Sequence, residues 1–267
     1  MRSALSHALK ALLISVGLLF AALFAPASAQ NFKPAGTGAT AKTPDGDPDL
    51  RGIWEVHATV NWNIEGHPAP DGVPASKSVI VDPRDGKIPY LPEARAKRLQ
   101  MNPADDPQAK CYMAGVPRVT YTPGPFQIFQ SAGLVIIVYQ DLHTYRYIPT
   151  TPRPQVDSAL FWLGSSRGHW DGDTLVVDTV SFNDQTWFDK VGNFHGEDLH
   201  VVERYKLAGP NKLQYEARIE DPKVFATPWT MRMTADRHRE PEFRIVEDEC
   251  LKSDDGKLYH TAPPSSR

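Results

Sequence analysis

Alternating hydrophobic and polar residues mark the second half of the chain as strand-forming. Between Lys212 and Glu220, leucine, tyrosine, alanine and isoleucine occupy every second position, and polar residues fill the positions between them. A later segment repeats this period with Trp229, Met231 and Met233. Because successive side chains of a strand point to opposite faces, these segments predict an antiparallel sheet with one buried face and one wet face.

Short turns join neighbouring strand segments. The sequences Ser-Ala-Gly, Gly-Asp and Ala-Gly-Pro-Asn separate three pairs of segments, and a Glu-Pro turn separates a fourth. The predicted hairpins join 126–131 to 134–140, 169–171 to 174–180, 200–207 to 212–220, and 229–238 to 243–251. Four successive hairpins predict an all-β fold, an antiparallel meander that forms a lipocalin-like or related barrel.

The first half of the chain contributes one strong strand and one helix. The strand opens with Gly52-Ile53-Trp54, and a Gly-x-Trp at this place resembles the opening strand of lipocalin-like barrels, where the tryptophan closes one end. The alternative is that Trp54 anchors an ordinary β core. The segment Pro92–Met101 begins with proline and continues with good helix formers, which predicts one short helix.

The N-terminal segment has the features of a signal peptide. Residues 1–29 carry two basic residues and then an uncharged apolar stretch of 14 residues, 11–24, and they end in Ala-Ser-Ala. Such a stretch is too short to span a bilayer comfortably, and the small residues match a signal-peptidase site. We therefore expect a mature protein that begins at Gln30 and is periplasmic or secreted.

The rest of the chain divides into a folded region and two polar ends. Residues 30–50 are rich in Pro, Gly, Thr and Asp and show no period, which predicts a flexible N-terminal arm. Residues 261–267 have the same character and predict a flexible tail. Residues 51–260 then form a single β-rich domain, which is long enough to bury a substantial core.

Net charge and hydropathy exclude two classes of partner. Without the leader, the chain carries 27 basic and 32 acidic residues, a net charge of −5. This balance argues against nucleic acid, which usually binds a basic face. No second long apolar run follows the leader, so we expect no membrane span after signal removal. The sequence carries no signal for an oligomeric state.

The mature chain has two cysteines, Cys111 and Cys250. An even pair in an exported protein usually forms a disulfide, which we predict here. The alternative is two buried free thiols. A catalytic thiol is not favoured, because neither cysteine lies in a Gly-rich or His-flanked setting that would lower its pKa.

The longest segment without strand character inside the predicted domain is Ser181–Leu199. It combines aromatic and acidic residues with a histidine, and His200 follows directly. Long loops in compact domains are commonly functional, so we predict a lid or binding wall with His195 as a catalytic candidate. Trp187 would supply an apolar wall, and Asp189 and His200 would orient partners or ligand. A packed surface loop whose acids cap turns is the alternative.

The strand 200–207 places a carboxylate on its apolar face, where Val201, Glu203 and Tyr205 lie together. Desolvation destabilises an ionised carboxylate among apolar neighbours and raises its pKa toward the range useful for proton transfer. Glu203 is therefore a catalytic candidate. Buried carboxylates are usually paired, and the alternative is a structural ion pair with Arg146 as the candidate partner.

A second concentration of polar residues follows the apolar strand 134–139. Asp141 ends that strand, and His143 and Tyr145 share one face of the next strand. A stripe of histidine and tyrosine can line a pocket, and histidine titrates near physiological pH. Asp141 and His143 are thus catalytic candidates, and Tyr145 and Arg146 are ligand-binding candidates. Ordinary core packing of these residues is the alternative.

The spacing of histidines does not favour a metal site. His195 and His200 lie five residues apart, a spacing that on a strand would place them on opposite faces. Only a bent loop could bring them to one ion with an acid such as Asp189 or Asp184. The chain has no helical His-x-x-x-His, no Gly-x-Ser-x-Gly, no Gly-x-Gly-x-x-Gly and no phosphate-binding loop. We therefore expect no metal and no cofactor.

One stretch of the chain resembles a known group of proteins. Trp162–Thr179 has the sequence WLGSSRGHWDGDTLVVDT, and His195 and the run 199–204 follow it. These features resemble a family of uncharacterised exported bacterial proteins with the signature W-x-G-x-S-x-G-x-W-x-G-D-T-L-V-V-D-T. The likeness extends from about Gly52 to Trp229. It brings no activity and no catalytic residue with it.

Titratable groups that cluster beside aromatic residues favour a small, partly apolar organic molecule as the ligand, bound near residues 181–200. We expect cofactor-independent acid–base chemistry on that molecule, as in a lyase, isomerase or hydrolase. The alternative from another class is a non-catalytic periplasmic binding or carrier protein with the same pocket. A third interpretation is a structural envelope protein, whose barrel would be filled and without a pocket.

Overall fold

The structure is a computed structural model that describes residues 42–57, 59–69 and 74–261. The predicted signal peptide lies outside the described residues, as do most of the predicted arm and all but the first residue of the predicted tail. The described end of the arm is part of the fold, because Leu50 is fully buried. Folded structure thus begins before the predicted boundary at residue 51.

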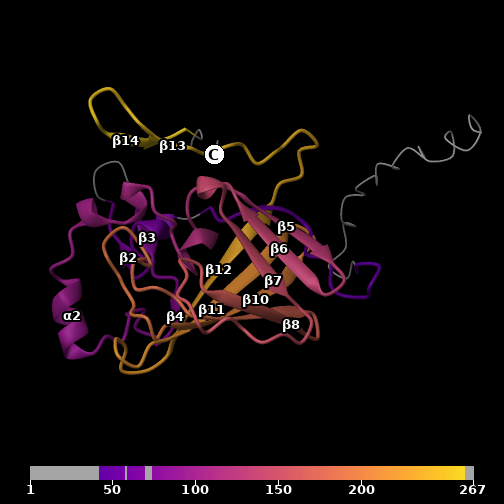
Figure 1. Cartoon of the computed structure of the whole chain (residues 1–267), viewed down its shortest axis with the longest axis horizontal. Helices are drawn as coiled ribbons and strands as arrows, with labels where there is room; N and C mark the ends of the chain where they lie inside the picture. The colour runs from indigo at the N-terminus through magenta and orange to yellow at the C-terminus, as the bar shows by residue number, and fades with distance from the viewer. Residues whose placement is uncertain (1–41, 58, 70–73, 262–267) are drawn as a thin grey trace, which may run out of the picture. The chain divides into compact units, whose positions relative to one another are not determined.

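Nine strands form one antiparallel sheet that is nearly closed into a barrel (Figure 1). The order in the sheet is β7-β6-β5-β1-β12-β11-β10-β9-β8, a meander with β1 inserted between its two halves. The prediction of an all-β antiparallel barrel is confirmed. The strands are β1 (Gly52–Glu55), β5 (Phe126–Ser131), β6 (Leu134–Tyr139), β7 (Tyr145–Pro149), β8 (Ser165–Asp171), β9 (Thr174–Val180), β10 (His200–Gly209), β11 (Lys212–Glu220) and β12 (Trp229–Arg237).

Smaller elements surround the nine-stranded sheet. The predicted helix is present as α2 (Pro92–Arg98), with proline in its first turn, and it ends before the predicted Met101. The short strands are β2 (Gly66–His67), which pairs with β3 (Ser76–Lys77); β4 (Ile80–Asp82), which pairs with β12; and β13 (Cys250–Lys252), which pairs with β14 (Leu258–His260). The 3-10 turns are η1 (Thr59–Asn61), η2 (Pro103–Asp105), η3 (Gln108–Lys110), η4 (Arg118–Thr120) and η5 (Asp141–His143).

Three of the four predicted hairpins are confirmed: β5 with β6, β8 with β9, and β10 with β11. The fourth is wrong, because residues 243–249 form no strand. A strand has two edges, and both edges of β12 are occupied, one by β11 and the other by β1 and β4. Cys250–Lys252 pairs instead with the following strand β14.

The barrel closes between its two edge strands, β7 and β8, and we call this junction the seam. Because nine strands that alternate in direction place their first and last members parallel, β7 and β8 run the same way. Among the described residues no strand ladder joins them, and side chains make the contact. A Cβ atom at Gly168 of β8 would lie 3.0 Å from Ile148 of β7, so the glycine allows the two strands to approach.

The barrel interior is filled by large side chains. Trp54 of β1 is fully buried, and its Nε1 donates to the Leu50 carbonyl at 2.9 Å. Tyr205 and Tyr215 are fully buried as a tilted ring pair, with centroids 5.1 Å apart. Tyr139 from β6 is also buried. Space for a ligand must therefore lie outside this interior.

Candidate functional site

A pocket of about 790 Å³ lies at the seam, and we call it the seam pocket. Its walls come from η5 and β7, from the segment that connects β7 to β8, and from the start of β8. The lining residues are Met113, 142–147, Pro149, Arg153, Pro154, Val156 and 160–166. The volume lies in the range typical of sites for small organic molecules.

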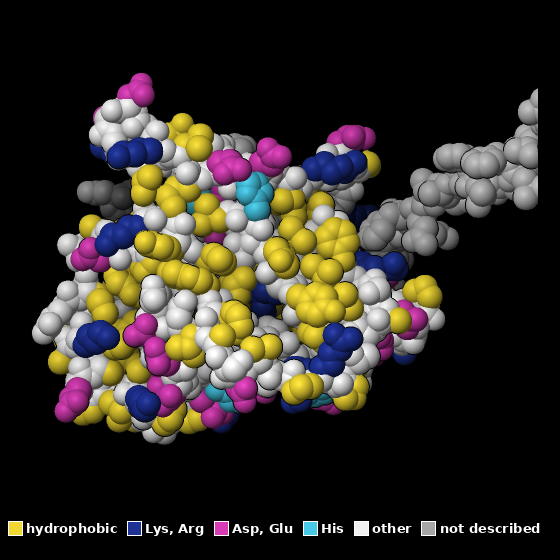
Figure 2. Space-filling model, viewed as in Figure 1, with side chains coloured by type: hydrophobic (Ala, Val, Ile, Leu, Met, Phe, Trp, Pro, Cys, Tyr) yellow, Lys and Arg dark blue, Asp and Glu magenta, His cyan; other side chains and the backbone are white. Residues whose placement is uncertain are grey.

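Exposed aromatic and aliphatic side chains dominate the walls of the seam pocket. Because side chains alternate along β7, Tyr145 and Tyr147 point outward, with 65% and 51% of their surfaces exposed. Leu160 and Phe161 are exposed on the connecting segment. Figure 2 shows hydrophobic side chains gathered over this face of the molecule. Apolar surface that remains exposed in a concave site is typical of a binding site.

The connecting segment is fixed by stacking and hydrogen bonds. The Trp162 ring lies parallel to the Tyr112 ring, with centroids 5.1 Å apart. Gln155 Nε2 donates to the carbonyls of Ser165 and Asp178 at 3.0 and 2.9 Å. These contacts hold the wall in place, so the pocket is largely formed in the protein alone.

Polar groups are few in the seam pocket. His143 is about half exposed, with its Nδ1 3.8 Å from a Glu249 carboxylate oxygen. Arg153 contributes a positive charge, and Ser166 accepts a hydrogen bond from Arg146 at 3.1 Å. The pocket therefore combines apolar walls with a small number of groups that can orient a ligand.

Three predicted site residues, His143, Tyr145 and Arg146, line the seam pocket. The predicted stripe of His143 and Tyr145 does border a pocket, although His143 belongs to η5 and precedes the strand. None of the residues 181–200 lines the seam pocket. The sequence did not single out Trp162 or the connecting segment as a wall, although the apolar run 159–163 directly before a strand was a usable signal.

Glu203 forms a buried ion pair with Arg146, the alternative that the sequence raised. Its Oε2 accepts from Arg146 Nη2 at 2.5 Å, and its Oε1 accepts from Arg146 Nη1 at 2.9 Å. The hydroxyls of Tyr205 and Tyr215 donate to the same Oε1 at 2.9 and 2.8 Å. Burial lowers the pKa of Arg146, but the charge and hydrogen bonds of Glu203 together with the nearby Tyr139 and Tyr205 outweigh it and hold that pKa above its ordinary range.

The Arg146–Glu203 pair connects strands on both sides of the seam. Arg146 Nη2 also donates to Ser166 of β8 at 3.1 Å and to Thr179 of β9 at 3.2 Å. The Arg146 guanidinium, which comes from β7, thus hydrogen-bonds to β8, β9 and β10 on the opposite side of the seam. Both members are almost completely buried and hydrogen-bonded, which is the arrangement of a structural pair.

His195 lies buried in a different part of the molecule. Its Nε2 is 2.7 Å from Thr186 Oγ1, and its Nδ1 is 2.9 Å from the Gly196 carbonyl. The carbonyl can only accept, so Nδ1 carries the proton and Nε2 accepts from the threonine. Burial lowers the pKa of His195, which favours this neutral form. Its ring packs on Phe188, with centroids 5.4 Å apart.

Asp189 organises the loop 181–199 from within. Its carboxylate is fully buried and accepts from the backbone N–H groups of Ile64 and Asn193, both at 3.0 Å, and from Asn193 Nδ2 at 2.6 Å. Burial raises the pKa of Asp189 to about 6, although these hydrogen bonds act in the opposite direction. The loop is therefore a packed structure tied to η1, and Trp187 packs against the core.

His200 stands apart from the other candidates. Its Nε2 lies 2.9 Å from Asp178 Oδ2 across the β9–β10 pair, and both side chains are about one-third exposed. His195 has its own partners, Thr186 and Gly196. The two histidines are engaged separately and do not converge on one place.

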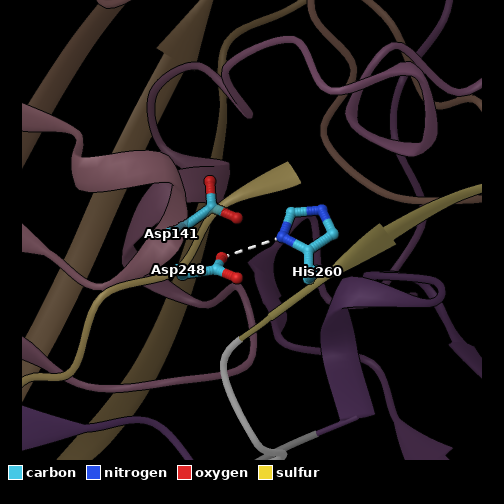
Figure 3. A group of neighbouring side chains, drawn as sticks. All are labelled: Asp141, Asp248 and His260. Atoms are coloured by element: carbon cyan, nitrogen blue, oxygen red, sulfur yellow. Dashed lines mark hydrogen bonds and ion pairs between the residues drawn. The ribbon is translucent and has the colours of Figure 1, made fainter. Parts of the chain in front are cut away.

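Asp141 belongs to a third cluster, with Asp248 and His260 (Figure 3). Its Oδ1 accepts from Gln108 Nε2 at 2.9 Å, and Asp248 Oδ2 lies 2.8 Å from His260 Nδ1. Burial raises the pKa of Asp141, while the bond from Gln108 and the nearby His260 partly offset that rise. Sequence reasoning missed Asp248 and His260, although the turn Asp254-Asp255-Gly256 was a hairpin signal.

The predicted disulfide is confirmed between Cys111 and Cys250, whose Cα atoms lie 5.9 Å apart. It joins the segment after η3 to the first residue of β13. Disulfides persist in oxidising compartments. None of the helices in the described part of the chain has the length and hydrophobicity that crossing a membrane requires.

No model of a protein family matches the chain, and no curated protein matches it.

Proposed function

We propose that this protein is an exported binding or carrier protein for a small, largely apolar organic molecule, which it holds in the seam pocket. The observation that carries this proposal is the concentration of exposed aromatic and aliphatic side chains around a concave site of about 790 Å³. Burying such surface against a ligand is favourable at roughly 25 cal/mol per Å².

Binding is better supported than acid–base catalysis, because the catalytic candidates are dispersed. Glu203 is held by Arg146 inside the barrel, and His195 is held by Thr186 in another region. Asp141 lies in the cluster with Asp248. Of the four catalytic candidates, only His143 lines the seam pocket, whose charged lining residues are Arg146 and Arg153.

The pocket walls indicate the chemistry of the ligand. Tyr145, Tyr147 and Trp162 offer ring faces and edges that suit a planar, aromatic molecule. Arg153 and His143 suit an acidic or hydrogen-bond-accepting group on that molecule. The proposed ligand class is therefore a planar organic acid or a similar amphipathic aromatic compound.

A fluorescent probe of this class tests the proposal. We expect 1-anilinonaphthalene-8-sulfonate to bind the folded protein saturably at one equivalent, with Kd at least about fivefold higher for the variant Tyr145→Ala/Tyr147→Ala. Each lost ring contact weakens binding by about 0.5–1.5 kcal/mol, and about 1.4 kcal/mol is tenfold in Kd. The matched control is Tyr259→Ala, a half-exposed tyrosine of β14 that does not line the pocket. Equal affinity of wild type and the double variant would refute the proposal.

A further inference from the structure

The cluster of Asp141, Asp248 and His260 brings together three side chains from separate places in the sequence. Asp141 lies in η5, Asp248 precedes β13, and His260 ends β14. One potential ligand atom from each residue lies within 4.8 Å of the other two. In Figure 3 the Asp141 carboxylate points toward the space between Asp248 and His260.

Asp141 is incompletely satisfied. Its side chain is 5% exposed, and its Oδ1 accepts from Gln108 Nε2, but its Oδ2 is buried and has no hydrogen-bond partner among the described residues. A buried carboxylate oxygen without a donor is destabilised, because it has lost water and gained nothing in exchange. The buried, unpartnered Oδ2 of Asp141 distinguishes this cluster from an ordinary group of surface acids.

Charge and donor type add a second argument. Two carboxylates lie beside each other here, and like charges at short range destabilise each other unless a cation or a proton lies between them. The third group is an imidazole, and a set of one nitrogen and two carboxylate oxygens suits Zn²⁺ and related transition metals better than Mg²⁺ or Ca²⁺, which take oxygen ligands.

We infer that Asp141, Asp248 and His260 bind one divalent transition-metal ion, with Zn²⁺ as the ion of choice. His260 Nδ1 now lies 2.8 Å from Asp248 Oδ2, and the ion takes the place of that contact. The His260 side chain is about one-third exposed, so the ion is reached from solvent, and water completes its coordination. The site is separate from the seam pocket in its ligands, although Leu142 and His143 follow Asp141 along the pocket wall.

The ion would connect η5 to both ends of the β13–β14 hairpin. Asp248 and His260 lie before and at the end of that hairpin, and Cys250 between them carries the disulfide to Cys111. Metal and disulfide would thus hold the hairpin by two independent attachments. If the ion holds the β13–β14 hairpin in this way, bound Zn²⁺ should protect the hairpin against proteolysis.

Calorimetry with ZnCl₂ alone tests the inference on full-length mature protein that has no affinity tag and has been treated with chelator. We expect one equivalent to bind with Kd of about 10 μM or lower, and Co²⁺ to give the visible absorption of a site with nitrogen and oxygen ligands. Kd should rise at least tenfold in His260→Gln and in Asp141→Asn. The matched control His169→Gln, an exposed histidine of β8, should bind as the wild type does.

Folding of each variant is checked by circular dichroism and by the absence of free thiols. Because His260 is the most exposed of the three, His260→Gln remains the decisive variant if Asp141→Asn does not fold. Absence of Zn²⁺ binding to the wild type would overturn the inference. Unchanged Zn²⁺ affinity in His260→Gln would overturn it as well, since the ion would then bind elsewhere.

Discussion

At the scale of single residues, the interior contains a buried charged pair that crosses the seam. Arg146 and Glu203 are almost fully buried and satisfy each other with two hydrogen bonds. Removing one partner of such a pair leaves an uncompensated charge in a medium of low polarity, whereas an exposed pair of the same type contributes little. Removing one partner of an Arg–Glu pair should therefore cost much more stability inside the barrel than on its exposed face.

Glu203→Gln tests this difference. We expect the free energy of unfolding to fall by about 3–5 kcal/mol, because the Arg146 charge loses its partner. The matched control is Glu216→Gln, which removes the partner of Arg232 on the exposed face of the same sheet and should change stability by less than about 1 kcal/mol. Denaturant unfolding measures both. Similar losses in the two variants would contradict a structural role for the buried pair.

Asp189 gives a prediction for pH. Its pKa is about 6 in the folded protein against an ordinary value of 3.8, so the folded state binds the proton more tightly than the unfolded state. The contribution of this group to stability therefore grows as pH falls through 6 and is complete below about 4. Relative to Asp189→Asn, the wild type should gain about 2–3 kcal/mol of unfolding free energy between pH 7 and pH 4.

Thermal or denaturant unfolding of wild type and Asp189→Asn across this pH range supplies the measurement. The comparison cancels groups that titrate equally in both proteins. A stability difference that does not change with pH would show that the Asp189 carboxyl is ionised throughout and that its three hydrogen bonds outweigh its burial.

At the scale of elements, the seam is where the barrel lacks a ladder. The path of strands around the barrel has nine members, an odd number, so its edges meet in parallel and side chains replace backbone hydrogen bonds. Gly168 permits the close approach of β8 to Ile148 and Thr150, at 3.0 and 3.1 Å from a Cβ at that position. The seam should be the most easily opened part of the wall.

Gly168→Val should separate the edge strands. We expect a loss of about 1–3 kcal/mol in unfolding free energy, as for other insertions into packed sites. Hydrogen exchange should rise first in β7 and β8. The matched control is Gly209→Val at the end of β10, where a Cβ meets nothing within 4 Å. Equal losses of unfolding free energy and equal hydrogen exchange in the two variants would mean that β7 and β8 move apart freely.

The strand pattern was the part of the structure that sequence predicted best. Period-two alternation and short turns located three hairpins correctly, because both signals are local. The fourth hairpin failed because pairing depends on which strand edges are free, and β1 occupies the edge of β12 from far away in sequence. The β13–β14 hairpin was missed because its strands are only three residues each, too short to show a period.

The candidate site was predicted less completely. Alternation placed Glu203 on the inward face, and an ion pair with Arg146 was one of two interpretations that the sequence left open. The structure contains that pair. The seam pocket could not be predicted, because it depends on how the two ends of a long meander meet. The third ligand of the proposed metal site, His260, lies more than a hundred residues from Asp141 and shares no local pattern with it.

At the scale of the whole molecule, the disulfide ties a peripheral hairpin to the body of the chain. Cys111 and Cys250 are 139 residues apart, and closing so long a loop stabilises the folded state by about 4–5 kcal/mol in the chain-entropy model. The hairpin β13–β14 is not part of the nine-stranded sheet. Loss of the disulfide should therefore affect the hairpin before the barrel.

Cys111→Ser/Cys250→Ser tests this order of events. We expect trypsin to cleave first at the exposed Lys252 and Lys257, while far-ultraviolet circular dichroism of the barrel persists and its unfolding free energy falls by up to about 4 kcal/mol. Lys212, at the start of β11, serves as the internal reference site. Cleavage at Lys212 before the hairpin would show that the disulfide supports the barrel itself.

The tyrosines that fill the barrel have an optical consequence. Burial raises the pKa of Tyr139, Tyr205 and Tyr215, and the Glu203 carboxylate raises each of them further. Their phenol groups keep their protons for as long as the strands enclose them. In alkaline solution, the ultraviolet phenolate absorbance of these three residues would therefore emerge only when the wall opens, so that absorbance would report the integrity of the interior without any added label.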